Sequence, residues 1–208
     1  MLEPNPSCAV ETTYDNAINA ASPVINWPMA ETSGSTASDT SGNSYNGTYS
    51  TSGVTPMAAN YGPYYGDGGG QTFDGSTGVA TAPSGFTSAY PSGAFTISEW
   101  VDPGTTDTGM YTYQSVFGNE DVDGSGNWYG VGMWGANAYG YLYLEPLIGL
   151  TSSNYGTLDY IYSGAAIPDG QWSLVQLVWV YDTTNSVWDL NLYIDGSWAG
   201  DTETNGAG

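Results

Sequence analysis

The chain has 208 residues, of which 21 are Asp or Glu and none is Lys, Arg or His, so its formal net charge is −21. This composition excludes a Ser-His-Asp or Cys-His nucleophile, a Lys Schiff base and a His-ligated zinc site. It also argues against nucleic acid as a partner, because binding along a phosphate backbone needs Lys or Arg. Membrane insertion is not expected either, since no apolar run approaches the ~18 residues of a membrane span.

Along the chain, residues 1–13 are expected to form an N-terminal arm, and Tyr14–Ala21 one or two helical turns. A first strand is predicted at Val24–Met29. After a turn-rich stretch, Phe73–Gly75 and Gly78–Ala82 are expected to pair as a hairpin.

The second half of the chain alternates between apolar and polar residues, which is typical of strands. In Ala94–Pro103, the residues Phe95, Ile97, Glu99 and Val101 share one face. Further strands are expected at Tyr111–Gly118, Trp128–Trp134, Tyr139–Leu144, Gln171–Asp182 and Ser186–Asp195. The predicted fold is all-β, a two-sheet antiparallel sandwich that forms a single domain over residues 14–208.

The order of motifs resembles the laminin-G-like jelly rolls of the concanavalin A-like lectin/glucanase superfamily. The motifs that carry the resemblance are Pro23–Glu31 (PVINWPMAE), Ser33–Thr48 with its SGN turn, Phe73–Gly75 (FDG), Phe95–Pro103 (FTISEWVDP), Asp169–Val178 (DGQWSLVQLV) and Leu192–Gly196 (LYIDG). The resemblance implies a jelly-roll sandwich with a short N-terminal helical turn. It leaves the activity open, because the superfamily spans lectins, enzymes, adhesion modules and capsid parts.

Where the family pattern usually has a cation, this sequence has none. Pro28 stands in place of the usual Arg, Asp102 in place of Lys, and Ser173 in place of His. This indicates selection against positive charge, for which we weigh an acidic and a saline habitat. Charged residues are only 10% of the chain, which favours acidic surroundings.

Residues 120–127 (EDVDGSGN) place oxygen-bearing side chains at alternate positions with glycines between them. This resembles the first half of a calcium loop, but Gly132 stands where an EF-hand has its closing Glu. A plain hairpin turn and a calcium site completed by distant oxygens both remain open. The calcium ligands would be Asp121, Asp123, Ser125 and Asn127. Asp39 with Asn43 is a weaker second candidate.

Glu99 is the one acid in an apolar row, and without a partner its pKa is expected to be raised by burial. It is either a structural residue, which is protonated or reaches the sheet edge, or a catalytic acid. Glucanases of the superfamily that the chain resembles use closely spaced acids on one face of a strand. Asp102 is three residues further on and therefore on the opposite face, so we expect no catalytic residues and no enzyme.

The aromatic residues make up 14% of the chain and offer a surface on which sugars can stack. Strands also favour aromatic residues for structural reasons alone, so both interpretations remain open. The candidate ligand-binding residues are Trp100, Trp128, Trp134, Tyr141 and Tyr143.

The predicted function is a non-catalytic, extracellular or virion-surface jelly-roll module for adhesion, glycan binding or assembly. The alternatives are an acid-active glycoside hydrolase and a purely structural filament or capsid subunit. Because few residues follow Gly196, we expect the domain to lack its final strands and to self-associate. Two alternatives remain open: the N-terminal arm fills the gap, or the sequence is a piece of a longer protein. Repulsion among the carboxylates is expected to raise their pKa values in the folded state.

Overall fold

The computed structural model groups the chain into two compact units, Met1–Tyr90 and Pro91–Gly208. The residues that it describes are 14, 16–58, 61–63, 69–88, 93–104, 112–118, 121–122, 128–138, 140–149, 159–160 and 166–204. The predicted arm at residues 1–13 lies outside them. A single domain over residues 14–208 stays a prediction, and each unit is described by itself.

The first unit consists of short strands joined by turns, as its Ser, Gly, Thr and Asn content predicts. Its elements are β1 (Thr36–Ala37), β2 (Gly47–Tyr49), β3 (Val54–Pro56), β4 (Gln71–Phe73), β5 (Ala80–Thr81) and the 3₁₀ helix η1 (Ser84–Ser88). Strands β1, β2 and β5 form one sheet, and β3 pairs with β4 in another. The predicted helical turn is present at residues 16–20, and the Ala21 N–H donates to the Ala17 carbonyl at 3.1 Å.

Two predictions for the first unit are wrong. Residues 24–29 form no strand, because Pro28 has no N–H to donate and Met29 has a φ of 55°. The expected hairpin is absent as well, since β4 pairs with β3 whereas β5 pairs with β2. The segment between β4 and β5 instead closes around Asp74, whose carboxylate accepts backbone hydrogen bonds from Ser76 and Thr77.

The second unit holds the longer strands, and every pairing among them is antiparallel. They are β6 (Phe95–Val101), β7 (Thr112–Gly118), β8 (Asp121–Val122), β9 (Trp128–Ala138), β10 (Tyr141–Gly149), β11 (Asp159–Tyr160), β12 (Ala166–Pro168), β13 (Ser173–Asp182), β14 (Val187–Ile194) and β15 (Ser197–Thr204). One sheet has the order β15-β14-β13-β6. The other has the order β11-β10-β9-β7, with β12 paired to β10 and β8 paired to β9.

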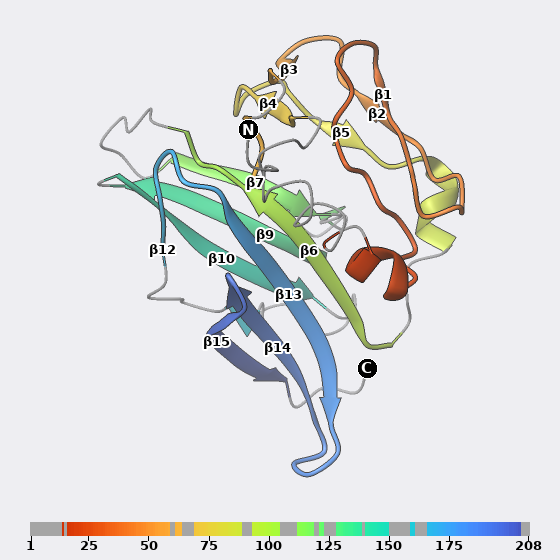
Figure 1. Ribbon diagram of the computed structural model, residues 1–208. Helices are drawn as coiled ribbons and strands as arrows, with labels where there is room; N and C mark the ends of the chain where they lie inside the picture. Colours follow the sequence, from red (N-terminus) through yellow and green to blue (C-terminus); the bar gives the residue numbers. More distant parts are fainter. Residues whose placement is uncertain are drawn as a thin grey trace, which may run out of the picture. The chain divides into compact units, whose positions relative to one another are not determined.

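The two sheets of this unit form the layers of a sandwich, seen in Figure 1 with β6, β13 and β14 in front of β9 and β10. Alternate residues of each long strand are buried, as expected for strands with one face on a core. The buried apolar side chains of the second unit are Val131, Met133, Ala136, Leu142, Leu144, Ile167, Val175, Leu177, Trp179, Val187, Leu190 and Leu192. The predicted all-β sandwich is confirmed.

Strand β13 is interior to its sheet, as its apolar sequence predicts, with β14 on one side and β6 on the other. At the end of the β13–β14 hairpin, the Trp179 and Trp188 rings stack with centroids 5.1 Å apart and an interplanar angle of 8°. Tyr181 packs against Trp188 at 5.4 Å and is partly exposed. This aromatic group closes the end of the core at the hairpin.

Candidate functional site

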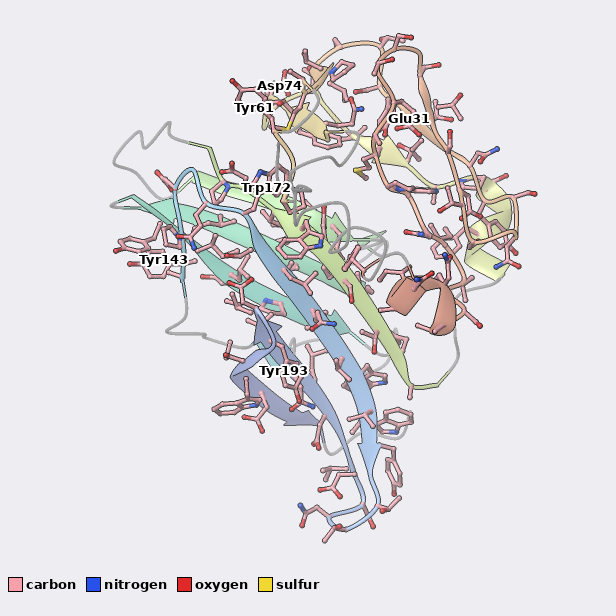
Figure 2. The ribbon with its side chains drawn as sticks, in the orientation of Figure 1. Glu31, Tyr61, Asp74, Tyr143, Trp172 and Tyr193 are labelled. Atoms are coloured by element: carbon pink, nitrogen blue, oxygen red, sulfur yellow. The ribbon has the colours of Figure 1, made fainter. Side chains whose placement is uncertain are left out.

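Strand β10 presents aromatic side chains on the face that it turns away from the core. Leu142 and Leu144 point inward and are buried, so the alternating Tyr141 and Tyr143 project to the other face. The two tyrosine rings lie 6.4 Å apart at an angle of 57°, and 43% of Tyr141 is exposed. Figure 2 shows Tyr143 on the side of β10 that faces away from β6 and β13.

Strand β9 adds an indole to the same face. Met133 is fully buried, so the next residue, Trp134, lies on the outer side of the sheet. The register places Trp134 directly opposite Glu145 of β10. Glu145 is two residues beyond Tyr143 and therefore continues the outward row. We call Trp134, Tyr141, Tyr143 and Glu145 the outer aromatic face.

The neighbours of the two tyrosines across the sheet are small. Pro168 and Ala166 of β12 lie opposite Tyr141 and Tyr143, and Ala136 of β9 lies opposite Tyr143 on the other side. Side chains of this size do not compete with the tyrosine rings for the space above the sheet. Tyr141 is exposed and Tyr143 is half-buried, so these rings offer a flat surface on which a ligand can stack.

The structure brings together three of the five predicted ligand-binding residues, Trp134, Tyr141 and Tyr143. Trp100 lies on β6, opposite Leu174, and so belongs to the other sheet of the sandwich. Trp128 begins β9 and its backbone pairs with Val122, but its side chain is outside the described part of the structure.

Glu99 lies on the inner face of β6, directly opposite Val175 of β13. Its neighbours on that face of β6 are Ile97 and Val101, as the alternation predicts. Burial raises the pKa of the Glu99 carboxyl to about 8. The group is therefore protonated at neutral pH, in agreement with the sequence prediction of a raised pKa.

A family model of laminin-G-like domains matches residues 73–207. Its description is Concanavalin A-like lectin/glucanases superfamily. The chain belongs to this family. No curated protein and no solved structure matches it. None of the helices in the described residues is long and apolar enough to span a membrane.

Because the superfamily includes glucanases, a pair of catalytic carboxylates is the first kind of active site to consider for this chain. A glycosidase holds two carboxyl groups roughly 5–10 Å apart across the scissile bond. Asp102 follows the end of β6 and accepts a hydrogen bond from the Gly104 N–H at 2.9 Å. The pKa of Glu99 is raised by burial, and no charged neighbour among the described residues contributes to it. Glu99 therefore has a general acid's raised pKa but no coupled second carboxylate in the part of the chain that the structure covers.

The predicted calcium loop lies mostly outside the described residues. Asp121 belongs to β8 and its backbone pairs with Tyr129, which makes β8 and β9 a hairpin around this loop. Asp123, Ser125 and Asn127 are not among the described residues, so calcium binding stays a prediction. Elsewhere in the described ranges, no three Asp, Glu or Cys side chains gather as metal ligands.

The second calcium candidate, Asp39, has its carboxylate oxygens engaged within the protein. They accept hydrogen bonds from the backbone N–H groups of Asn26, Ser41 and Tyr45 at 2.8–3.0 Å and from the Ser41 hydroxyl. Partial burial raises the pKa of Asp39, but these hydrogen bonds outweigh it and the pKa lies below its ordinary value. Asn43 instead donates to the Val24 carbonyl at 3.1 Å. Asp39 therefore holds the loop together.

Two further acids of the first unit hold loops and were not predicted from the sequence. Glu31 accepts hydrogen bonds from the Ser38 N–H at 2.7 Å and the Tyr49 hydroxyl at 2.8 Å. Asp74 accepts from the Gly78 N–H at 2.8 Å as well as from Ser76 and Thr77, and these bonds hold its pKa well below the usual range. An Asp followed by Gly, Ser or Thr is the signal that predicts such turns.

Proposed function

We propose that this chain is a non-catalytic jelly-roll module that binds glycans through the outer aromatic face. The observation that carries the proposal is the row of Tyr141 and Tyr143 on β10 with Trp134 beside it on β9. Sugars stack their apolar faces on aromatic rings, and the tyrosine hydroxyls offer hydrogen bonds to sugar hydroxyls. The superfamily to which the chain belongs includes lectins, which agrees with this ligand class.

The proposal also places the module outside a cell or on a virion, where surface glycans are found, and in acidic water. A surface of Tyr, Ser, Thr, Asn and Gly without cations stays close to uncharged where carboxylates are protonated. A glycan array run at acid and at neutral pH tests the binding. We expect binding to neutral glycans to persist at both pH values, because stacking and hydroxyl hydrogen bonds do not require carboxylate charge.

Variants locate the binding face. Tyr143→Ala and Trp134→Ala are each expected to weaken glycan binding about tenfold, the value of one stacked ring. Trp198→Ala is the matched control, because Trp198 is 62% exposed but lies on β15 of the other sheet. Loss of binding in Trp198→Ala, with Tyr143→Ala unaffected, would remove the outer aromatic face from the proposal.

A second candidate function is an acid-active glycoside hydrolase, which the raised pKa of Glu99 favours. Hydrolysis assays on every glycan that the array identifies would test it, with Glu99→Gln as the variant. Release of reducing sugar by the wild-type chain and not by Glu99→Gln would establish the hydrolase in place of the non-catalytic module.

A third candidate is a purely structural subunit of a filament or capsid. Strand β15 lies at the end of its sheet in the order β15-β14-β13-β6, and an end strand can pair with a second copy. Light scattering at acid and neutral pH tests this candidate. An assembly in solution combined with an empty glycan array would favour the structural subunit over the glycan-binding module.

A further inference from the structure

The charge of the chain restricts which glycans the outer aromatic face can accept. The sulfate, phosphate and carboxylate groups of a glycan form their strongest charge pairs with cationic side chains, and this chain has no Lys, Arg or His at any of its 208 positions. Its 21 carboxylates instead create a negative potential around the molecule when they are ionised. Acidic glycans are therefore repelled, whereas neutral and cationic glycans are not.

The outer aromatic face also places a carboxylate beside an indole. Glu145 of β10 lies directly opposite Trp134 of β9, and both project from the same face of the sheet. Directly opposed residues of an antiparallel pair have Cβ atoms about 4.5–5.5 Å apart. An ammonium group held there touches the electron-rich face of an indole and forms a charge-assisted hydrogen bond with a carboxylate.

The position of this pair relative to the tyrosines matters for a sugar chain. Glu145 follows Tyr143 by two residues on the same strand face, and Tyr143 follows Tyr141 by the same step. A sugar chain stacked along β10 over the two tyrosine rings therefore reaches Glu145 and Trp134 with its next unit. Ser115 of β7 lies opposite Trp134 on the far side and offers an exposed hydroxyl to that unit.

We infer that, where its carboxylates are ionised, the outer aromatic face binds glycans that carry free amino groups, with the ammonium seated between Glu145 and Trp134. The inference rests on the proposed function and names its ligand class: an oligomer of unacetylated hexosamine. N-acetylation removes the positive charge and so removes the contribution of Glu145, but it leaves the ring stacking in place. Acidic oligosaccharides do not bind.

Calorimetric titration with three short oligosaccharides of equal length tests the inference: a glucosamine oligomer, its fully N-acetylated counterpart and a galacturonic acid oligomer. The titrations are run near pH 6, where model carboxylates are ionised and aliphatic amines are protonated. We expect the glucosamine oligomer to bind about tenfold more tightly than the acetylated one, as a charge-assisted hydrogen bond predicts. We expect no binding of the galacturonic acid oligomer.

Two isosteric variants separate local recognition from general attraction to a negative protein. Glu145→Gln removes one charge at the proposed seat, and Asp201→Asn removes one charge on β15 of the other sheet. We expect Glu145→Gln to lose most of the preference for the amine and Asp201→Asn to keep it. Both changes preserve side-chain volume, and the melting temperature of each variant verifies that it folds.

The outcomes distinguish this inference from the proposed function. Equal affinity for the free and acetylated oligomers, or the same loss of preference in both variants, would overturn the ammonium seat. In that case, the proposed function would still be supported if Tyr143→Ala weakens the binding of the acetylated oligomer. If none of the three oligosaccharides binds, the proposal of an ammonium seat is wrong. The glycan array then decides whether the outer aromatic face binds any sugar.

Discussion

Glu99 of β6 and Val175 of β13 face each other on the inner side of their sheet, so a carboxyl group stands in an apolar row with no cation anywhere in the sequence. In the described part of the chain, the side chains that share the interior with Glu99 carry no titratable group. On its own sheet they are Ser173 and Leu177 of β13 and Leu190, Leu192 and Ile194 of β14. On the opposing sheet they are Val131, Met133, Leu142, Leu144 and Pro146. Only protonation can neutralise this carboxyl group.

This arrangement predicts how stability depends on alkaline pH. The pKa of Glu99 is about 8 in the folded protein and ~4.3 in an unfolded chain, so folding takes up a proton between these values. The resulting stability is fully present below pH ~4.3 and is lost as the pH rises to about 8. Glu99→Gln cannot ionise, so at pH ~9 it should be more stable than the wild type by up to about 5 kcal/mol.

Urea unfolding of the wild type and Glu99→Gln at pH values from ~5 to ~9 measures this difference. Near pH 5 the two proteins should be nearly equally stable, and the gap should widen as the pH rises. Parallel stability curves over the whole range would show that the carboxyl group is not buried as described.

Asp39 predicts the opposite dependence at acid pH. The pKa of Asp39 in the folded protein lies below its ordinary value because of the hydrogen bonds from Asn26, Ser41 and Tyr45. Its contribution to the stability of the fold is therefore present above pH ~3.9 and is lost as the pH falls through the folded pKa. Asp39→Ala should destabilise the protein by about 2–4 kcal/mol at neutral pH, since several backbone N–H groups lose their acceptor.

Asp39→Asn is the matched variant, because its amide keeps one oxygen acceptor but no charge. We expect a stability between those of the wild type and Asp39→Ala at neutral pH, with less loss on acidification than in the wild type. Thermal melts at pH ~3 and ~7 measure both effects. Equal acid sensitivity of the wild type and Asp39→Asn would contradict the role given to Asp39.

The sequence prediction that all folded carboxylates have raised pKa values is therefore only partly right. Burial raises the pKa of Glu99. The pKa of Asp189 is also raised, most of all by burial and less by repulsion from Asp182 and Asp201. It is lowered for Asp39, Asp74, Glu31 and Asp182. Net charge alone does not reveal these local hydrogen bonds, which depend on how each loop closes. Stability is expected to reach its maximum between the acid and alkaline losses.

The second unit was easier to predict than the first for a physical reason. The strand β14 alternates over eight residues, and its inward Leu190 and Leu192 mark the core face directly. In the first unit the strands have two or three residues, and side chains such as Asp39 and Asp74 hold the backbone in place of a hydrogen-bonded ladder. Loops that are held by side chains leave no periodic pattern of apolar residues in the sequence, so they could not be predicted in this way.

The candidate site was predictable as a set of aromatic residues but not as a surface. Which aromatics share a face depends on strand register and sheet membership, and the sequence of Trp100 gives no sign that it lies in the other sheet. Glu145 was overlooked, although its position two residues after Tyr143 on the same strand was a usable signal. The pairing of Glu145 with Trp134 required the observed register of β9 and β10.

Calcium binding by the loop after β8 leads to a separate prediction. If Asp121, Asp123, Ser125 and Asn127 bind calcium, the ion stabilises the folded state by mass action and raises the melting temperature. Asp123→Ala should abolish that rise. Calorimetry at neutral pH with calcium and with chelator measures it. An unchanged melting temperature would leave the loop as a hairpin turn between β8 and β9.

The close approach of Gly53 and Gly78 in the first unit gives the last prediction. A Cβ on Gly78 would collide with the Gly53 carbonyl oxygen, and the Gly78 N–H is already fixed by its hydrogen bond to Asp74. Backbone atoms cannot rotate out of the way as a side chain can, so Gly78→Ala should destabilise the protein by about 2–4 kcal/mol. The matched control is Gly85→Ala, because a Cβ on Gly85 has no neighbour within 4 Å. Its stability should stay within about 0.5 kcal/mol of the wild type. Urea unfolding of the two variants decides the matter, and equal stabilities would show that the loops around Gly53 and Gly78 do not meet.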